Sequence, residues 1–292
     1  GIITETGGTT SHSAILARAL EIPAVLSVEG VASSLKNGDT VVVDGSEGAV
    51  IVNPDDNTVS EYSKKRDAFL AERKETKSAS GEVYELFCNI GKPEDAVKAV
   101  DADGEGVGLF RTEFLFMDRT SIPTEDEQFE AYKKAALILK GKSLIIRTLD
   151  IGGDKDIPYL GLEKEENPFM GFRAIRYCLK NRELFKSQIK AILRASAFGD
   201  IKIMFPLITT MDELREGKKL VAECKADLRN MGINFNENIQ VGVMVETASA
   251  AVIADMLAKE ADFFSIGTND LTGYTMACDR GNNDVSYLYS PL

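Results

Sequence analysis

The chain reads GVGLFRTEFLFM over residues 106–117, in which an apolar run is followed by a charged residue. This order recurs through most of the sequence. Residues 106–110 form a short apolar run of the length expected for a buried strand, and Arg111 follows the run directly. The same succession appears at RTLDIGGDK, residues 147–155, which comes after the apolar run that begins at Ser143. A strand that ends in charged residues is therefore the repeating unit of this sequence.

Six strands of this kind are expected between residue 82 and the end of the sequence. Their ranges are 86–90, 106–110, 143–148, 201–206, 240–245 and 263–266. Helical patterns lie between them. One helix is predicted to begin at Thr124, which forms a capping box with Glu127, and another at Thr210, with Glu213 as its partner. Alternation of strands and helices predicts an α/β fold with parallel strands and crossover helices.

The polar motifs all follow strands, which is where (β/α)8 barrels of the TIM type place their active sites. Residues 82–292 are therefore predicted to form such a barrel. Six strands are fewer than the eight that a barrel needs, so we expect a barrel truncated at its C-terminus. An open, doubly wound sheet is the structural alternative. Because the sequence begins at Gly1 rather than at methionine, it is interpreted as part of a longer polypeptide.

Residues 1–54 are predicted to form a separate, partial domain. A short strand is expected at 1–4, a helix at 13–20 and a strand at 24–26. Two β-rich runs, 40–43 and 49–52, flank the turn residues DGSEG and predict a hairpin-like connection. The highly charged residues 55–81 are predicted to form an exposed linker helix.

Composition limits the classes of partner. The chain holds 34 Lys and Arg against 46 Asp and Glu, a formal net charge of −12, which disfavours nucleic acid as a partner. No apolar run approaches the roughly 20 residues that a membrane span needs. The 4 cysteines have neither metal-site spacing nor a dense disulfide pattern, so a reducing, cytoplasmic environment fits best.

His12 is the only histidine of the chain, and it lies in GGTTSHSAILAR, residues 7–18. This stretch is typical of a glycine-rich turn that enters a helix, where free backbone N–H groups and the helix dipole attract an anion such as phosphate. A histidine there has a nucleophilic ring nitrogen near pH 7. We interpret His12 as a carrier of a phosphoryl group; a histidine that merely caps or packs the helix start is the alternative.

Two strands are followed by arginines, at Arg111 and Arg147, and Arg280 lies in a third motif, CDRG. The planar guanidinium group matches the oxygens of phosphates and carboxylates. The alternative for each arginine is a structural salt bridge at the rim of the barrel.

Two carboxylates also follow strands, Glu246 and Asp270. Carboxylates placed in this way are suited to Mg²⁺, a hard cation that takes oxygen ligands and keeps some waters. The alternative is that Asp270 or Asn269 caps the helix that follows.

Taken together, the six motifs resemble the phosphoenolpyruvate-protein phosphotransferases, the enzyme I family of the bacterial sugar phosphotransferase system. They are GGTTSHSAILAR (7–18), GVGLFRTEFLFM (106–117), IRTLDIGGDK (146–155), VMVET (243–247), SIGTNDLT (265–272) and CDRG (278–281). The resemblance implies a phosphohistidine (swivelling) domain at residues 1–54 and a phosphoenolpyruvate (PEP)-binding barrel at residues 82–292. It implies transfer of the phosphoryl group of PEP to His12, with release of pyruvate, and from there to a histidine phosphocarrier protein. A homodimer is implied for the full-length protein.

The resemblance also implies roles for individual residues. The positions matching substrate-binding residues are Arg111, Arg147, Asn269, Asp270 and Arg280, and those matching the magnesium ligands are Glu246 and Asp270. Lys155 and Arg173 match further phosphate contacts.

The sequence departs from the family pattern at several points. Thr9 stands where the family often has arginine, and Ala248 stands where it usually has proline. The cysteine that protonates the enolate belongs to a Gly-Met-Cys-Gly-type segment that this sequence lacks, so we expect the fragment to bind PEP without efficient turnover. Two other functions stay open: an enzyme of the pyruvate phosphate dikinase or PEP synthase type, and a regulatory protein that binds PEP without catalysis.

Overall fold

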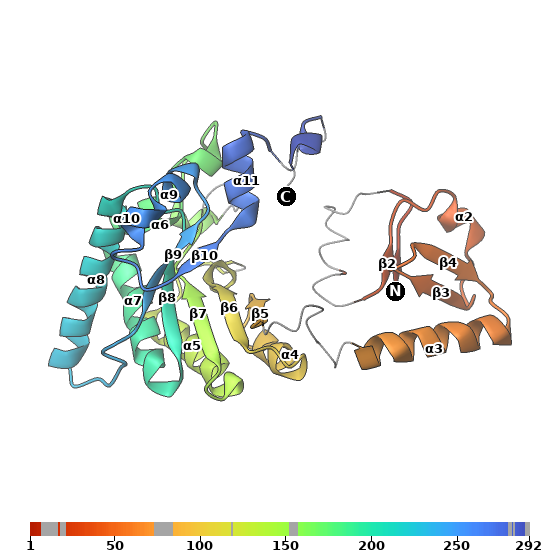
Figure 1. Ribbon diagram of the computed structural model, residues 1–292, viewed down its shortest axis with the longest axis horizontal. Helices are drawn as coiled ribbons and strands as arrows, with labels where there is room; N and C mark the ends of the chain where they lie inside the picture. The colour runs from red at the N-terminus through yellow and green to blue at the C-terminus, as the bar shows by residue number, and fades with distance from the viewer. Residues whose placement is uncertain are drawn as a thin grey trace. The chain divides into compact units, whose positions relative to one another are not determined.

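The computed structural model describes residues 1–6, 17, 22–72, 84–117, 119–151, 157–279, 282 and 284–289. The chain divides into two compact units, Gly1–Gly81 and Glu82–Leu292. Figure 1 shows the elements of both units.

The first unit contains two small sheets. Strand β1 (Ile2–Ile3) pairs in parallel with β2 (Ala24–Val25), and β3 (Val41–Asp44) pairs antiparallel with β4 (Ala49–Val52). The Asp44 carboxylate accepts the backbone N–H groups of the two residues at the tip of the β3–β4 turn, which confirms the predicted hairpin. A short helix, α2 (Val31–Ser34), was not expected from the sequence.

The predicted linker segment is helical over α3 (Asp56–Glu72), and its remaining residues up to 81 lie largely outside the described part of the chain. The helix predicted at residues 13–20 lies outside it too, apart from residue 17, which is helical.

The second unit is built on one parallel sheet of six strands. The strands are β5 (Phe87–Ile90), β6 (Gly106–Arg111), β7 (Ser143–Arg147), β8 (Ile201–Phe205), β9 (Val241–Val245) and β10 (Phe264–Ile266). Each begins and ends within about one residue of its predicted range, because short apolar runs bounded by polar residues mark buried strands. The glycine at the start of β6, Gly106, is required there, since an added Cβ would lie 2.5 Å from the carbonyl oxygen of Ser143 on β7.

The spatial order of the strands decides between the two predicted architectures. It runs β5-β6-β7-β8-β9-β10, and every neighbouring pair is parallel. A doubly wound sheet reverses direction at a switch point, whereas this sheet continues in one direction throughout. The doubly wound alternative is therefore wrong, and the six strands form a half-barrel consistent with an incomplete (β/α)8 barrel.

Helices connect the strands, and several short 3₁₀ helices (η) occur in the loops. The helices are α4 (Asp95–Asp101), α5 (Glu125–Leu139), α6 (Ala174–Lys180), α7 (Arg182–Ala195), α8 (Met211–Asn230), α9 (Ala248–Val252), α10 (Ala254–Leu257) and α11 (Thr268–Met276). The 3₁₀ helices are η1 (Thr112–Leu115), η2 (Pro158–Leu160), η3 (Pro168–Met170), η4 (Ser196–Phe198) and η5 (Ser286–Leu288). Helices α4, α5, α7 and α8 pack side by side in the order of the chain, as right-handed crossovers from a parallel sheet require. Within the described residues, no helix is both long and apolar enough to span a bilayer.

The helix starts follow local sequence signals. Thr124 and Glu127 form the predicted capping box at the start of α5, and Thr210 with Glu213 forms the second one at the start of α8. In each box the threonine hydroxyl accepts a backbone N–H of the first turn while the glutamate accepts the N–H of the threonine.

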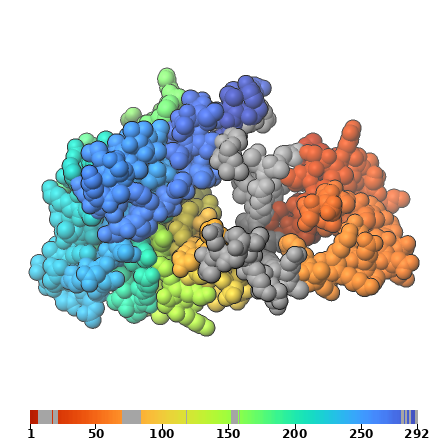
Figure 2. Space-filling model, viewed as in Figure 1, coloured from red at the N-terminus to blue at the C-terminus, as the bar shows by residue number. Residues whose placement is uncertain are grey.

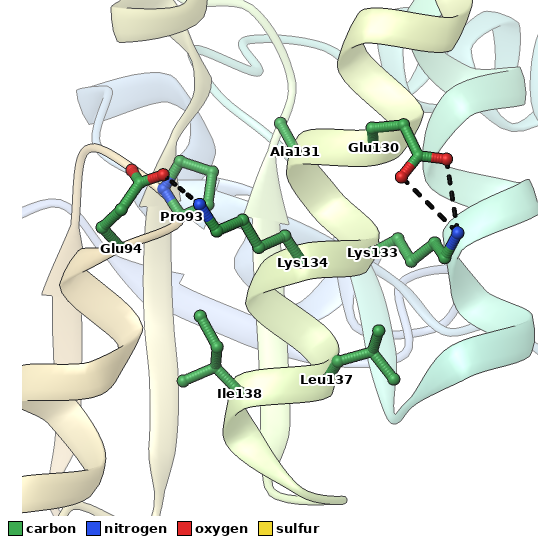
Figure 3. Close-up of a pocket in the computed structure, with 8 residues that line it drawn as sticks. All are labelled: Pro93, Glu94, Glu130, Ala131, Lys133, Lys134, Leu137 and Ile138. Atoms are coloured by element: carbon green, nitrogen blue, oxygen red, sulfur yellow. Dashed lines mark hydrogen bonds and ion pairs between the residues drawn. The ribbon is translucent and has the colours of Figure 1, made fainter.

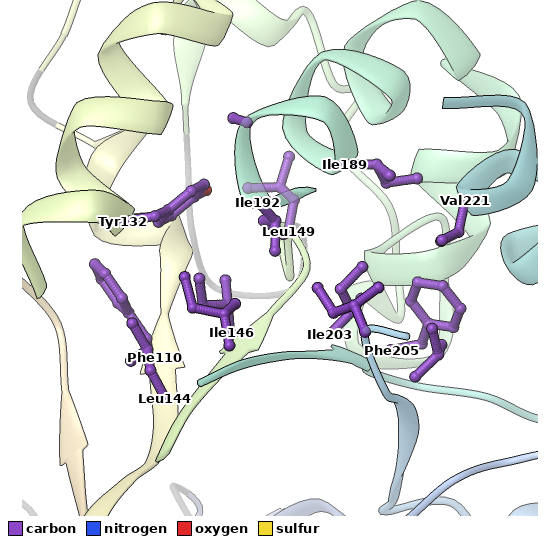
Figure 4. Close-up of a cluster of buried hydrophobic side chains, with 14 of the residues drawn as sticks. Phe110, Tyr132, Leu144, Ile146, Leu149, Ile189, Ile192, Ile203, Phe205 and Val221 are labelled. Atoms are coloured by element: carbon purple, nitrogen blue, oxygen red, sulfur yellow. The ribbon is translucent and has the colours of Figure 1, made fainter. Parts of the chain in front are cut away.

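The core of the second unit lies between the sheet and the crossover helices (Figure 4). Strand residues such as Phe110, Ile146 and Phe205 face helix residues such as Tyr132 and Ile189, and all five are fully buried. This packing fixes the strands and so fixes the edge of the sheet where their carboxyl ends lie.

Candidate active site

The predicted site residues gather at the carboxyl-terminal edge of the parallel sheet. Arg111 is the last residue of β6 and Arg147 the last residue of β7, and the two are register partners across the ladder. Glu246 follows β9 directly, and Asp270 lies in the first turn of α11, which begins after β10. Because all four strands are parallel, their ends bring these side chains to one edge.

Arg147 is almost buried, with 7% of its surface exposed, and it lies between two carboxylates. Its Nη2 is 2.9 Å from Oε1 of Glu113, and its Nη1 is 3.1 Å from Oδ2 of Asp150. Burial by itself lowers the pKa of Arg147, but the carboxylates of Asp150, Glu113 and Glu246 raise it above its ordinary value, so the guanidinium stays charged. Arg147 therefore forms buried ion pairs, as the alternative of a structural salt bridge predicted.

Two hydrogen-bond donors at the end of β7 are available to a ligand or water. Nε of Arg147 and the hydroxyl of Thr148 are buried, and neither has a hydrogen-bond partner among the described residues. Buried polar groups are usually paired, and such exceptions often indicate a place for a ligand or water.

Arg173 continues the row of charges. Its guanidinium makes three hydrogen bonds of 2.9–3.2 Å to the carboxylate of Asp150, and its Nη2 is 3.3 Å from Oδ2 of Asp270. Burial tends to lower the pKa of Arg173, but Asp150 and Asp270 raise it. The side chains thus alternate in sign from Glu113 through Arg147, Asp150 and Arg173 to Asp270.

Glu246 is as deeply buried as Glu113, with 2% of its surface exposed. Its Oε1 accepts the backbone N–H of Leu207 at 2.7 Å. Burial, together with the nearby carboxylate of Asp150 and the more weakly acting one of Asp270, raises the pKa of Glu246 to about 7 against the opposing effect of Arg147. A carboxylate held beside other carboxylates in a buried place is an arrangement that a bound cation stabilises.

The absence of a side chain at Gly267 leaves room for the buried side chain of Glu246. A Cβ at this position would lie 2.7 Å from Cβ of Glu246 and 2.8 Å from its Oε2. The N–H of Gly267 donates to the carbonyl of Val245 at 3.0 Å, so the backbone directly after β10 passes beside the glutamate.

Asp270 does not cap the helix on which it lies. The N-cap position of α11 is Gly267, which makes no side-chain capping bond, and the Asp270 carboxylate instead faces Arg173. The predicted capping alternative for Asp270 is therefore wrong. Asn269 does not cap α11 either; its Oδ1 accepts a hydrogen bond of 3.1 Å from the hydroxyl of Tyr289.

The oxygens of Glu246 and Asp270 fit a hard divalent cation. The part of the chain that the structure describes holds no cluster of three or more histidine, cysteine or acidic side chains suited to a metal. A magnesium ion there would therefore rely on these two carboxylates, water and the oxygens of a bound substrate, which is the usual way in which proteins hold Mg²⁺ beside a phosphate.

Of the other predicted residues, Arg111 is exposed at the same edge, and three lie outside the described part of the chain. The guanidinium of Arg111 lies 5.1 Å from the centre of the Phe114 ring. His12, Lys155 and Arg280 lie outside the described residues.

Three residues of the site were not assigned from the sequence: Glu113, Asp150 and Tyr274. Glu113 and Asp150 lie within the quoted motifs RTE and RTLD, so their position after a strand was the available signal. The Tyr274 hydroxyl lies 3.3 Å from Nη1 of Arg173 and donates to the carbonyl of Phe169. This contact joins α11 to the loop before α6, and Figure 2 shows the surfaces of the two segments, blue and green, side by side at the upper edge.

A hollow on the outside of the unit does not belong to this site. It lies at α5 and the start of α4, and it is lined by Pro93, Glu94, Glu130, Ala131, Lys133, Lys134, Leu137 and Ile138 (Figure 3). Its lysines pair with its own glutamates, Lys134 with Glu94 and Lys133 with Glu130, and no strand-end residue reaches it.

Comparisons with known proteins agree with this arrangement. Residues 65–292 match the family described as PEP-utilising enzyme, PEP-binding domain, and residues 1–48 match the family described as PEP-utilising enzyme, mobile domain.

Curated relatives are similar to the chain over its whole length. The chain is 53% identical over 299 aligned residues to the phosphoenolpyruvate-protein phosphotransferase of Bacillus subtilis (strain 168). It is 52% identical to the protein of that name from Priestia megaterium and 50% identical to the one from Staphylococcus carnosus (strain TM300). In each comparison all of this chain is covered, and it spans 52% of the relative's length.

Proposed function

Because this chain belongs to the family of PEP-utilising enzymes, we propose that it is part of a phosphoenolpyruvate-protein phosphotransferase, enzyme I of a sugar phosphotransferase system. The proposed reaction transfers the phosphoryl group of PEP to His12, releases pyruvate, and passes the group on to a histidine phosphocarrier protein. The observation that carries the proposal is the meeting of Arg147, Arg173, Glu246 and Asp270 at one edge of the sheet.

The arginines are proposed to bind the two anionic groups of PEP. Arg111 is exposed at the end of β6, with its guanidinium carbon 5.1 Å from the centre of the Phe114 ring, so its donors are accessible to a ligand. Arg147, its register partner on β7, offers a buried Nε–H. Two guanidinium groups on adjacent strands suit a substrate that carries a phosphate and a carboxylate.

Glu246 and Asp270 are proposed to hold Mg²⁺, and Asn269 and Arg280 to complete the substrate site. Bound Mg²⁺ would neutralise charge on the phosphate and on the enolate oxygen that departs. The ion pairs of Arg173 with Asp150 and Asp270 orient the second carboxylate before substrate arrives, and preorganised charge of this kind is a large term in phosphoryl transfer.

His12 is proposed as the nucleophile. A bond forms between a ring nitrogen and phosphorus as the bond from phosphorus to the enolate oxygen breaks, and the enolate then takes up a proton to become pyruvate. Little covalent work is left to the sheet, whose proposed tasks are to align PEP and to stabilise negative charge.

We propose three parts for the chain: a partial phosphohistidine domain at residues 1–54, a linker helix at 55–81 and a truncated PEP-binding (β/α)8 barrel at 82–292. The six parallel strands in sequential order support the last part. A homodimer and a cytoplasmic location are proposed for the full-length protein.

The test is labelling of the purified chain with PEP that carries a radioactive phosphate, with and without Mg²⁺. The proposal predicts an acid-labile, base-stable label that requires Mg²⁺ and is absent from a His12→Ala variant. The full-length protein serves as the reference, since absence of label from both proteins contradicts the proposed phosphotransferase. Passage of the label to a histidine phosphocarrier protein supports the proposed enzyme, whereas consumption of ATP by the full-length protein indicates the dikinase type instead.

A further inference from the structure

Gln188 is a polar residue in an otherwise apolar position. It lies on α7, whose buried face also contains Phe185, Ile189 and Ile192, and no part of its own surface is exposed. A buried amide is costly unless its hydrogen bonds are made, so this residue is expected to have specific partners.

The side chain of Gln188 makes three hydrogen bonds. Its Oε1 accepts the backbone N–H of Leu149 at 2.9 Å. Its Nε2 donates to the hydroxyl oxygen of Thr112 at 3.1 Å and to that of Tyr132 at 3.3 Å. The orientation of the amide is determined, because a backbone N–H such as that of Leu149 can only donate.

These bonds join the two strand ends that carry the arginines. Thr112 follows Arg111 directly, and its hydroxyl donates to the carbonyl of Arg147 at 2.8 Å. Leu149 lies two residues after Arg147. One side chain from a helix thus fixes the backbone beside both arginines.

The β6–β7 ladder is irregular upstream of the two arginines. Its register shifts between Val107 and Phe110, and regular pairing resumes with Phe110 opposite Ile146 and Arg111 opposite Arg147. A local irregularity in a ladder changes the direction of the side chains that follow it. The bonds through Gln188 and Thr112 hold the chain just beyond Arg111 and Arg147, the last pair of this ladder.

We propose that Gln188 is a positioning residue that sets the relative placement of Arg111 and Arg147 for binding the phosphate and carboxylate of PEP. This inference rests on the proposed function of the strand ends. Gln188 itself lies in the core and touches no ligand; it acts through Thr112 and through the backbone of Leu149.

The test compares two variants of the 292-residue chain. Gln188→Met removes the three bonds at nearly constant volume. Gln128→Met is the matched control, because Gln128 is also a buried glutamine, at the far end of the same network, where it bonds Pro123 and Tyr132 but neither strand end. Titration calorimetry with PEP in the presence of Mg²⁺ gives the dissociation constant of each variant, and urea unfolding gives its stability.

The inference predicts that Gln188→Met raises the dissociation constant for PEP about tenfold, the scale on which supporting hydrogen bonds act on a binding site. Gln128→Met is predicted to change it less than about twofold, although both variants lose stability by similar amounts. Equal dissociation constants for the two variants would overturn the inference. Should Gln188→Met not fold, Thr112→Val breaks the same link from its other end and is expected to weaken PEP binding to the same extent; unchanged binding in that variant overturns the inference.

A second readout separates this inference from the proposed function. The Nε–H resonance of Arg147 in the ligand-free chain is expected to shift in Gln188→Met and to stay in place in Gln128→Met. If the wild-type chain does not bind PEP, the proposed function fails, and the resonance decides on the positioning role by itself. An unshifted resonance in Gln188→Met contradicts that role.

Discussion

Replacement of Glu246 by glutamine is expected to stabilise the metal-free chain at neutral and higher pH. The carboxylate is buried beside Asp150 and Asp270, which raises its pKa to about 7 from 4.5. Glutamine keeps an oxygen that can accept the N–H of Leu207, and it has no charge to bury. The variant is thus predicted to be more stable and unable to bind metal, as expected when an acid is retained for function.

The expected gain in stability follows from the rise of the Glu246 pKa from 4.5 to about 7, which corresponds to about 3 kcal/mol. Below pH 4.5 the glutamate is protonated in both the folded and the unfolded chain, so this shift makes no difference to the pH dependence. Between pH 4.5 and 7 the folded chain retains a proton that the unfolded chain has released, so wild-type stability falls as pH rises. Above pH 7 the full difference of about 3 kcal/mol separates the wild type from the variant.

The assay is urea unfolding at a series of pH values from 4 to 8.5 with a chelator present, for wild type and Glu246→Gln. Glu237→Gln is the control, because Glu237 lies on the surface in an ion pair with Arg229 that lowers its pKa. That variant is expected to show no gain in stability with rising pH.

Two results would contradict the expected pH-dependent gain in stability of Glu246→Gln. One is a difference between wild type and Glu246→Gln that does not change between pH 4.5 and 7.5. The other is a variant that is less stable than the wild type at pH 8. Addition of Mg²⁺ and PEP should reverse the order of stability, because only the wild type retains both proposed metal ligands.

Three further changes have expected outcomes. Arg147→Gln removes the buried positive charge that pairs with Glu113 and Asp150 and should reduce the free energy of unfolding by about 3 kcal/mol or more in urea titrations, whereas an unchanged midpoint would show that the ion pairs of Arg147 contribute nothing. Gly267→Ala should displace the Glu246 side chain and abolish the stabilisation by Mg²⁺ with PEP in thermal melts; a wild-type response to Mg²⁺ would mean that the close approach is relieved elsewhere. Thr210→Ala should cost about 1 kcal/mol by loss of the capping box of α8, and a loss below a few tenths in urea unfolding would count against that box.

The predictable parts of the fold depend on neighbours in the sequence. The capping boxes at Thr124 and Thr210 involve residues three apart, and the strands are apolar runs whose burial needs no further information. The strand order was also foreseeable in outline, since six similar strand–helix units leave few topologies.

The unpredicted parts of the site depend on residues far apart. Asp150 lies in the quoted motif RTLD, but no role was predicted for it. Its second partner, Arg173, is 23 residues away, and no sequence pattern links the two. No role was predicted for Gln188 from the sequence, and only its contacts with Thr112 and Leu149 distinguish it from other polar residues of the helix.

The backbone conformation at the site could not be predicted from the sequence either. Leu207, whose N–H binds Glu246, has φ of 55°, and Ala174, directly after Arg173, has φ of 51°. Leucine and alanine rarely adopt this left-handed conformation, so no sequence rule predicts it, and such strain is held in place by the surrounding structure.

The ends of β6, β7, β9 and β10 are proposed to form one site for PEP and a divalent cation. The most direct measurement is a crystal structure of the chain with PEP and Mn²⁺ in place of Mg²⁺, with anomalous scattering recorded at the manganese edge. We expect an anomalous peak between the carboxylates of Glu246 and Asp270, with the phosphate of PEP against Arg111 and Arg147. A manganese peak that touches neither carboxylate, or PEP bound away from this edge of the sheet, would contradict it.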